Sequence, residues 1–337
     1  MFKNGVFENR RNFLLGACAA AGVMAVATGG AEAAFPKSPN GKTLAGVFPI
    51  GWTPCTPDNK LDTAAMAKQM EFLNKGRVAG MAWPQNASGW ESLTVDEWTA
   101  GAEALASVKG RAALVLGVQT KGYNVANSQA YARVAKRLNA DGIISIVPPN
   151  VSDAEVISYF KALDAAAGLP IMVQAVGDTT VDTLIALSKA VPSIVAIKDE
   201  AGDPLENGPQ ILRRSGGSLE VFSGSGGMHF FPEMELGFTG TCPYVGLADV
   251  LQASFDHYQA GRKDQAFQVF GAFLAFNSLP HANDYVLKAR GVFAEDAIMR
   301  ANPASGAPRR RASPITDAQK AEIRKALASY LKPYLIA

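Results

Sequence analysis

The sequence predicts an α/β fold, a TIM (β/α)8 barrel followed by a C-terminal helical extension. Two observations predict it. From Leu44 to near Ala260, short apolar runs alternate with amphipathic stretches, and the alternation recurs roughly every 25 to 35 residues. So regular a repeat, sustained over about 220 residues, favours a closed barrel over an open doubly wound sheet.

The strands are predicted from apolar runs bounded by glycine, proline or polar residues. They cover residues 45–52, 79–83, 113–118, 142–147, 170–176, 194–198, 219–223 and 240–245. An amphipathic helix is expected after each strand, over residues 62–75, 94–108, 127–138, 152–166, 180–190, 204–214, 228–236 and 249–260. Thr94 with Glu97 has the pattern of a capping box at the start of the second helix.

The first residues are a different kind of sequence. Arg10 and Arg11 precede a mild, Ala/Gly-rich apolar run that ends at Ala31-Glu32-Ala33. This order is typical of a twin-arginine signal peptide with an A-x-A cleavage site. The run is short and polar residues follow it at once, which disfavours a buried or membrane-spanning helix. We expect export to the periplasm by the twin-arginine machinery, and no stable membrane insertion after removal of the signal.

The predicted organisation has four parts. They are a signal peptide (1–33), a linker (34–43), the barrel (44–262) and the C-terminal helical extension (263–337).

Composition limits the classes of partner. The chain has 337 residues, of which 48% are hydrophobic and 18% charged, with a formal net charge of +2. Apart from the run 309–311, basic residues are interspersed with acidic ones, so no surface is set up to bind nucleic acid. Cys55 and Cys242 remain after signal removal without metal-ligand spacing, and we expect buried thiols, with a single disulfide as the alternative.

Lys198 is the strongest catalytic candidate from position alone. It ends the apolar run 194–197, and the residues just past the strand ends form the active face of such barrels. Apolar surroundings favour the neutral amine, which is the form that attacks a carbonyl to give an imine. The alternative is a strand-end lysine that reaches solvent or pairs with Asp199 or Glu200.

Three stretches resemble a known family. They are residues 48–58 (F-P-I-G-W-T-P-C-T-P-D), 139–149 (N-A-D-G-I-I-S-I-V-P-P) and 192–203 (P-S-I-V-A-I-K-D-E-A-G-D). On these, the chain resembles the dihydrodipicolinate synthase and N-acetylneuraminate lyase family of class I aldolases, over roughly residues 44–332. Lys198 falls on that family's Schiff-base lysine.

The resemblance carries several implications. Family members bind a 2-keto acid, such as pyruvate or a keto sugar acid, as an imine. They then make or break a carbon–carbon bond or dehydrate a sugar acid. The resemblance implies no metal and no organic cofactor, and a homo-oligomer by family analogy.

The sequence departs from the family pattern at the site itself. Gln174 stands in the place of the proton-relay tyrosine, and an amide does not transfer protons near neutral pH. The usual acid/base step is therefore missing or has moved, with Tyr123 and Tyr244 as candidate replacements. The loop that holds the keto acid's carboxylate in the family is altered too, although Ser88 and Gly89 still offer a hydroxyl and an amide.

Two functional hypotheses follow. The first is a Schiff-base-dependent lyase (aldolase, synthase or hydro-lyase) acting on a 2-keto acid. The second is a non-catalytic exported barrel that binds a keto acid or sugar acid, and the two differ in whether a proton donor lies near the imine. The expected site residues are Lys198, Gln174 and Tyr244 as catalytic groups and Thr53, Ser88, Gly89 and Ser225 as substrate-binding groups.

Overall fold

The computed structural model describes residues 35–300, 310–311 and 315–336. The predicted signal peptide, residues 1–33, lies outside the described residues.

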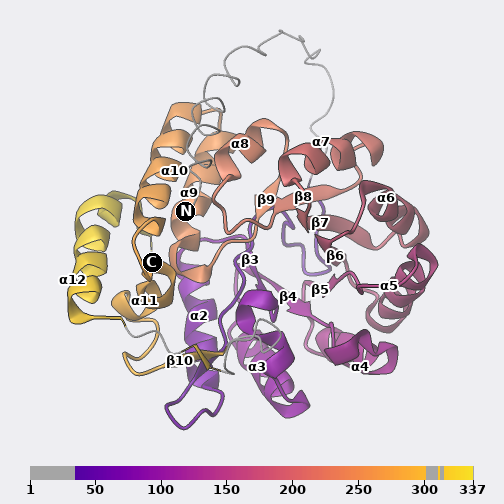
Figure 1. Cartoon of the computed structure of the whole chain (residues 1–337), viewed down its shortest axis with the longest axis horizontal. Coiled ribbons are helices and arrows are strands. Elements are labelled where there is room, and N and C mark those ends of the chain that lie inside the picture. The colour runs from indigo at the N-terminus through magenta and orange to yellow at the C-terminus, as the bar shows by residue number, and fades with distance from the viewer. Residues whose placement is uncertain (1–34, 301–309, 312–314, 337) are drawn as a thin grey trace, which may run out of the picture. The chain divides into compact units, whose positions relative to one another are not determined.

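Eight parallel strands form the centre of the fold (Figure 1). They are β1 (Gly46–Val47), β3 (Gly80–Trp83), β4 (Ala113–Gly117), β5 (Gly142–Ile146), β6 (Ile171–Gly177), β7 (Ile194–Ala201), β8 (Glu220–Ser223) and β9 (Gly240–Thr241). The hydrogen-bonded order is β1-β9-β8-β7-β6-β5-β4-β3. A parallel bridge from Ile50, just after β1, to Ala82 of β3 joins the two ends of this order, and a second bridge from Ile50 to Tyr244 extends the β1–β9 pairing. The predicted (β/α)8 barrel is confirmed.

The first and last strands are shorter than the sequence predicts. Residues 45–52 and 240–245 form ladders only at Gly46–Val47 and Gly240–Thr241. Pro49 and Pro243 have no N–H to donate, so a regular ladder cannot continue through them. Their carbonyls still accept, since Ala82 N donates to Pro49 O at 3.0 Å and Ile50 N to Pro243 O at 2.8 Å.

A helix follows each strand and lies outside the ring of strands (Figure 1). The helices are α2 (Thr63–Lys75), α3 (Val95–Ser107), α4 (Val125–Arg137), α5 (Asp153–Ala167), α6 (Val181–Ala190), α7 (Pro204–Arg214), α8 (Phe230–Glu235) and α9 (Ala248–Gln259). The capping box predicted at α3 is present: Glu97 N donates to Thr94 Oγ1 at 3.2 Å and Thr94 N donates to Glu97 Oε2 at 3.0 Å. Sequence-local signals therefore set this helix start.

Two groups of buried apolar side chains make up the core. The larger group packs the strands against the surrounding helices. The smaller one fills the barrel interior and consists of Leu44, Phe48, Ile50, Ala82, Ala113, Val115, Ile144, Met172, Ala196, Phe222 and Cys242. Because the interior is filled, a ligand has access only at an end of the barrel.

The N-terminal end of the barrel is covered by the segment that the sequence assigns to a linker. The buried Asp141 carboxylate, just before β5, accepts hydrogen bonds from Ser38 Oγ at 2.9 Å, Asn40 Nδ2 at 2.8 Å and Lys42 Nζ at 3.2 Å. Residues 38–42 are thereby held at the N-terminal end, opposite the C-terminal mouth at which barrels of this fold have their active sites.

The C-terminal part contains the predicted helices and a small sheet that the sequence does not predict. The helical elements are α10 (Lys263–Asn277), α11 (Ala282–Ala289), α12 (Asp317–Ala326), a π-helical turn (Leu327–Leu331) and a 3-10 turn (Lys332–Tyr334). Strand β10 (Ile298–Arg300) pairs antiparallel with β2 (Pro54–Cys55) and with β11 (Arg310–Arg311). Among the described residues, no helix has the length and apolar character needed to cross a membrane.

Candidate active site

Lys198 lies on β7 with its side chain toward the barrel axis. Side chains alternate along a strand. Ala196 belongs to the apolar group inside the barrel and Ile197 to the group outside it, so Lys198 and Glu200 are on the inner face. Lys198 is beside Gln174 of β6 and Phe222 of β8 in the strand register. Its side chain is only 3% exposed.

A carboxylate contacts the buried amine directly. Lys198 Nζ donates a hydrogen bond to Glu200 Oε1 at 2.8 Å, and the Glu200 side chain is 27% exposed. From its sequence position alone, Glu200 is only a possible surface partner of the lysine. The two residues do pair, but inside the mouth. There the lower effective dielectric makes a hydrogen bond between charged groups stronger than at the surface.

Gln174 completes this inward-facing group. Its side chain is fully buried, and Nε2 donates a hydrogen bond to Glu200 Oε2. Each carboxylate oxygen of Glu200 thus accepts from a different neighbour. Gln174 Oε1 is buried and has no hydrogen-bond partner, which leaves an acceptor free for a donor on a ligand.

Gly224 makes room for Glu200. A Cβ at this position would lie 2.0 Å from Cγ and 2.7 Å from Cδ of Glu200. A glycine directly after β8 is therefore needed for Glu200 to occupy the mouth. Lys198, Glu200, Gln174 and Gly224 form a unit that we call the lysine–glutamate group.

Between the outer face of β7 and β8 and helix α8 lies a buried acidic cluster. It consists of the carboxyls of Asp199 and Glu233 with the hydroxyl of Ser223. The pKa of the Glu233 carboxyl is raised to about 7, mainly by burial and to a smaller extent by Asp199, while the Ser223 hydroxyl lowers it. Burial also raises the pKa of Asp199 to about 6, against the hydrogen bond from Ala201 N at 3.1 Å. Neither oxygen of Glu233 makes a hydrogen bond of good geometry. Asp199 alternates away from the mouth, so this cluster bears on stability.

The predicted binding residues Thr53 and Ser88 are engaged with the protein itself. Thr53 Oγ1 donates to Ser88 O at 2.7 Å and accepts from Trp83 Nε1 at 2.9 Å. Ser88 Oγ donates to Gly51 O at 2.5 Å and accepts from Gln85 N at 3.0 Å. Gly89, in the left-handed region at φ 68°, donates its amide to Asn86 O at 3.1 Å. These groups hold the loops after β1 and β3 together, and a role in binding substrate stays a prediction.

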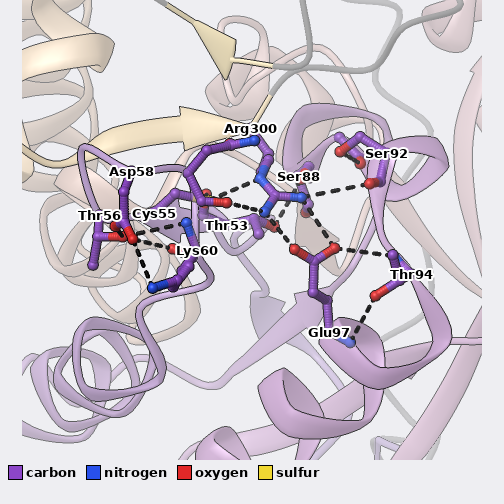
Figure 2. A network of polar contacts seen from close by, with 12 residues as sticks. Thr53, Cys55, Thr56, Asp58, Lys60, Ser88, Ser92, Thr94, Glu97 and Arg300 are labelled. Carbon is purple, nitrogen blue, oxygen red and sulfur yellow. Dashed lines mark hydrogen bonds and ion pairs between the residues drawn. The ribbon is translucent and has the colours of Figure 1, made fainter.

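Arg300 fixes the same two loops from the C-terminal part (Figure 2). It is fully buried, and its guanidinium donates to Glu97 Oε1 at 2.5 Å and Oε2 at 3.1 Å. Nε donates to Cys55 Sγ at 2.8 Å, and the backbone N of Arg300 donates to Thr53 O at 3.0 Å. A side chain from β10 thus positions the loop that carries Thr53 and the start of α3.

Of the remaining candidates, Tyr244 stacks on Trp52, with ring centroids 5.3 Å apart and planes 9° apart. Ser225 is half-buried in the turn after β8, and its amide donates to Ser223 Oγ at 3.4 Å. Tyr123 packs edge-on against Trp90 and Tyr159. Burial raises the pKa of Tyr123 to about 12. None of these side chains contacts the lysine–glutamate group through a hydrogen bond in the described structure, and their roles stay predictions.

A cavity of about 350 Å³ opens beside the loops after β3 and β4. Its aromatic lining includes Trp90, Trp98 and Tyr131, and Lys198 is not among its lining residues. Trp90 is mostly buried and donates Nε1 to Asn86 Oδ1 at 3.0 Å. Trp90 is therefore held in the wall of this lateral cavity.

Both described cysteines, Cys55 and Cys242, are buried, and no disulfide joins them. Cys242 lies in the barrel interior, where burial raises its pKa to about 12. Among the described residues no group of three or more His, Cys, Asp or Glu side chains is arranged to hold a metal ion.

The fold and the site together define a class: a (β/α)8 barrel that presents a buried lysine amine, hydrogen-bonded to a carboxylate, at its C-terminal mouth. A sequence profile of the dihydrodipicolinate synthetase family matches residues 43–277. The chain belongs to this family.

Relatives are distant in sequence and alike in length. L-2-keto-3-deoxyarabonate dehydratase of Azospirillum brasilense is 22% identical over 302 residues, which cover 86% of this chain and 96% of the relative. A 4-hydroxy-tetrahydrodipicolinate synthase of Salinibacter ruber is 26% identical over 253 residues, 70% of this chain and 82% of the relative. The crystal structure of an Escherichia coli K12 prophage protein of the same family, in complex with pyruvate, has a TM-score of 0.71 at 21% identity and covers 85% of this chain and 98% of its own. It shows the shared fold.

Proposed function

We propose that the chain is a lyase that acts on a 2-keto acid through a Schiff base on Lys198. The observation that carries the proposal is the place of this amine: 3% exposed, at the open end of a barrel whose interior is otherwise filled. A lysine amine there attacks the keto carbon to form an imine, and the protonated imine draws electrons from the adjacent carbon–carbon or carbon–hydrogen bond. The named activities of the relatives, and the pyruvate bound by one of them, support a keto acid as substrate class.

The test is reductive trapping. The purified chain is incubated with pyruvate or with a keto sugar acid, reduced with borohydride and weighed intact. We expect a mass increase of one reduced keto acid in the wild type and none in K198A. K198R is the matched control, because it keeps a cation beside Glu200 but forms no imine. A folded wild-type chain that gives no adduct with either acid would contradict the proposal.

We also propose that residues 1–33 direct export to the periplasm. Arg10-Arg11, the apolar run and Ala31-Glu32-Ala33 support this. In a bacterium with a twin-arginine pathway, the chain should appear in the periplasm with a new N-terminus near Ala34. The R10K/R11K variant should stay in the cytoplasm at full length. Equal export of both chains would contradict the twin-arginine assignment.

We propose finally that the chain forms a homo-oligomer, by analogy with the family. Exposed apolar side chains at the starts of α3 and α4, Val95 at 64% and Val125 at 43%, are compatible with a covered surface there. Light scattering after size exclusion should give a multiple of the chain mass. A monomer at micromolar concentration would contradict this proposal without touching the imine chemistry.

A further inference from the structure

Gln174 stands in the place of the family's proton-relay tyrosine, so the imine chemistry needs another proton carrier, and the lysine–glutamate group has an ionisable side chain beside the amine. Glu200 follows Lys198 by two residues on β7, so both side chains lie on the same face of the strand. In the described part of the chain, Glu200 is the ionisable side chain that hydrogen-bonds Nζ, at 2.8 Å. This distance between Nζ and Oε1 lies within the heavy-atom range over which a general base accepts a proton.

The position of Glu200 is fixed on two sides. Gln174 Nε2 donates to Oε2, so the carboxylate cannot rotate without losing this bond. The absent side chain of Gly224 leaves the space that Cγ and Cδ occupy. The carboxylate is also 27% exposed, which lets it exchange protons with solvent.

Other candidate carriers lie elsewhere or hold their protons too tightly. Asp199 alternates to the outer face, and its Oδ1 accepts from Ala201 N. Burial raises the pKa of Tyr123 and of Cys242 to about 12, far from the range in which a group exchanges protons quickly near neutral pH. Tyr244 stacks flat on Trp52 and makes no hydrogen bond to the lysine–glutamate group in the described structure, so it is a weaker candidate than Glu200.

We propose that Glu200 is a catalytic residue that carries the protons of imine formation and of the following step at C3 of the keto acid. This inference rests on the proposed function. It assigns to a carboxylate on β7 the task that a tyrosine on β6 has in the family.

The proton balance closes without a further reactant. The Glu200 carboxylate takes a proton from the Nζ ammonium, and the freed lone pair bonds C2 as the carbonyl pair moves to oxygen. Glu200 returns this proton to the oxygen, takes a second one from nitrogen and delivers it to the hydroxyl, which leaves as water while the nitrogen pair forms the iminium. Glu200 then removes a proton from C3; the C–H pair becomes the C2–C3 double bond, and the C–N π pair returns to nitrogen.

The experiment is methyl-proton exchange of pyruvate in D2O, followed by NMR, together with borohydride trapping on the same samples. Exchange reports removal and return of the C3 proton, whereas trapping reports the imine. The wild type should exchange and trap. We expect E200Q, which keeps the size of the side chain, to slow exchange by about 10²- to 10⁴-fold, the usual contribution of a general acid–base group. E206Q, at an exposed carboxylate on α7, is the matched control and should behave as the wild type.

Two further variants separate proton transfer from positioning. E200G opens space for a small carboxylate, so added formate should restore exchange in proportion to its concentration. G224A retains both Lys198 and Glu200 but displaces the latter, because its methyl group would overlap Cγ. It should slow both exchange and the appearance of the adduct, although the adduct still forms on long incubation because Lys198 is retained.

Each contrary outcome has a distinct meaning. Exchange by E200Q within threefold of the wild type would overturn the inference and leave the Schiff base standing. Loss in E200G that formate does not restore would also overturn it, because Glu200 would then only position Lys198. A wild-type chain with neither adduct nor exchange would contradict the proposed function itself, and this inference with it.

Discussion

Arg300 on β10 and Glu97 on α3 form a two-bonded ion pair across 203 positions of sequence. The guanidinium is fully buried, and the Glu97 side chain is 20% exposed. The pair therefore joins the C-terminal part of the chain to the start of the second barrel helix.

Removing Arg300 should be costly. R300A leaves Glu97 without its cation and frees acceptors on Cys55 and Asn59, so we expect a loss of about 3–5 kcal/mol of unfolding free energy. Urea denaturation measures it. R214A, which breaks the surface pair with Asp182, is the control and should cost less than about 1 kcal/mol. Equal losses in the two variants would contradict the role given to Arg300.

The acidic cluster under α8 predicts a stability that falls as pH rises. The pKa of Glu233 is about 7 in the folded chain against an ordinary 4.5, so the unfolded chain loses this proton first. The contribution of Glu233 to the free energy of unfolding is fully present below pH 4.5. It is lost as the pH rises to about 7, by on the order of 3 kcal/mol. Asp199, with a pKa of about 6 against 3.8, acts in the same direction over a lower window.

E233Q should remove most of this dependence. Urea midpoints of the two chains should be similar at pH 5 and higher for E233Q at pH 8, because the amide carries no charge to bury. E206Q, at an exposed carboxylate, should follow the wild type at both values. A wild-type midpoint that does not change between pH 5 and pH 8 would argue against the raised pKa of Glu233.

Gln174 should matter through the hydrogen bond that it donates. Q174M keeps the length of the side chain but donates nothing to Glu200 Oε2. A hydrogen bond to a charged group contributes about 1.5–3 kcal/mol, so imine trapping should slow by about tenfold or more. The rate of adduct appearance measures this. Unchanged trapping would mean that Glu200 holds its position without Gln174.

The two cysteines should behave as buried thiols. In a C18S chain, which removes the cysteine of the signal segment, a thiol reagent should label neither Cys55 nor Cys242 quickly in the folded state. Both should react after unfolding without reductant. A pair that stays unreactive in denaturant until reduced would demonstrate a disulfide instead.

The barrel was predictable because its signals are local. Apolar runs, their spacing and cap residues such as Thr94 are all readable within one strand–helix unit, and the observed helices begin within two residues of most predicted starts. The strand β10 was not predictable. It has three residues and pairs with the two-residue β2 some 245 positions away, so no periodicity marks either one.

At the site, Lys198 and Gln174 were found because each occupies a motif position. Glu200 was predicted only as a surface partner of the lysine. A glutamate two residues after a strand-end lysine gives the same sequence pattern whether the pair lies in solvent or inside a barrel mouth. The space left by Gly224, directly after the next strand of the sheet, distinguishes the two cases, and sequence alone does not reveal it. The buried hydrogen bonds of Thr53 and Ser88 likewise depend on loops that meet only in three dimensions.

Imine formation between Lys198 and a 2-keto acid is best tested by locating the reduced adduct in the sequence. After trapping with pyruvate, trypsin cannot cleave at a modified Lys198. We expect a single peptide spanning residues 190–213 that carries the added mass. An adduct found on other lysines, with cleavage at Lys198 intact, would contradict it.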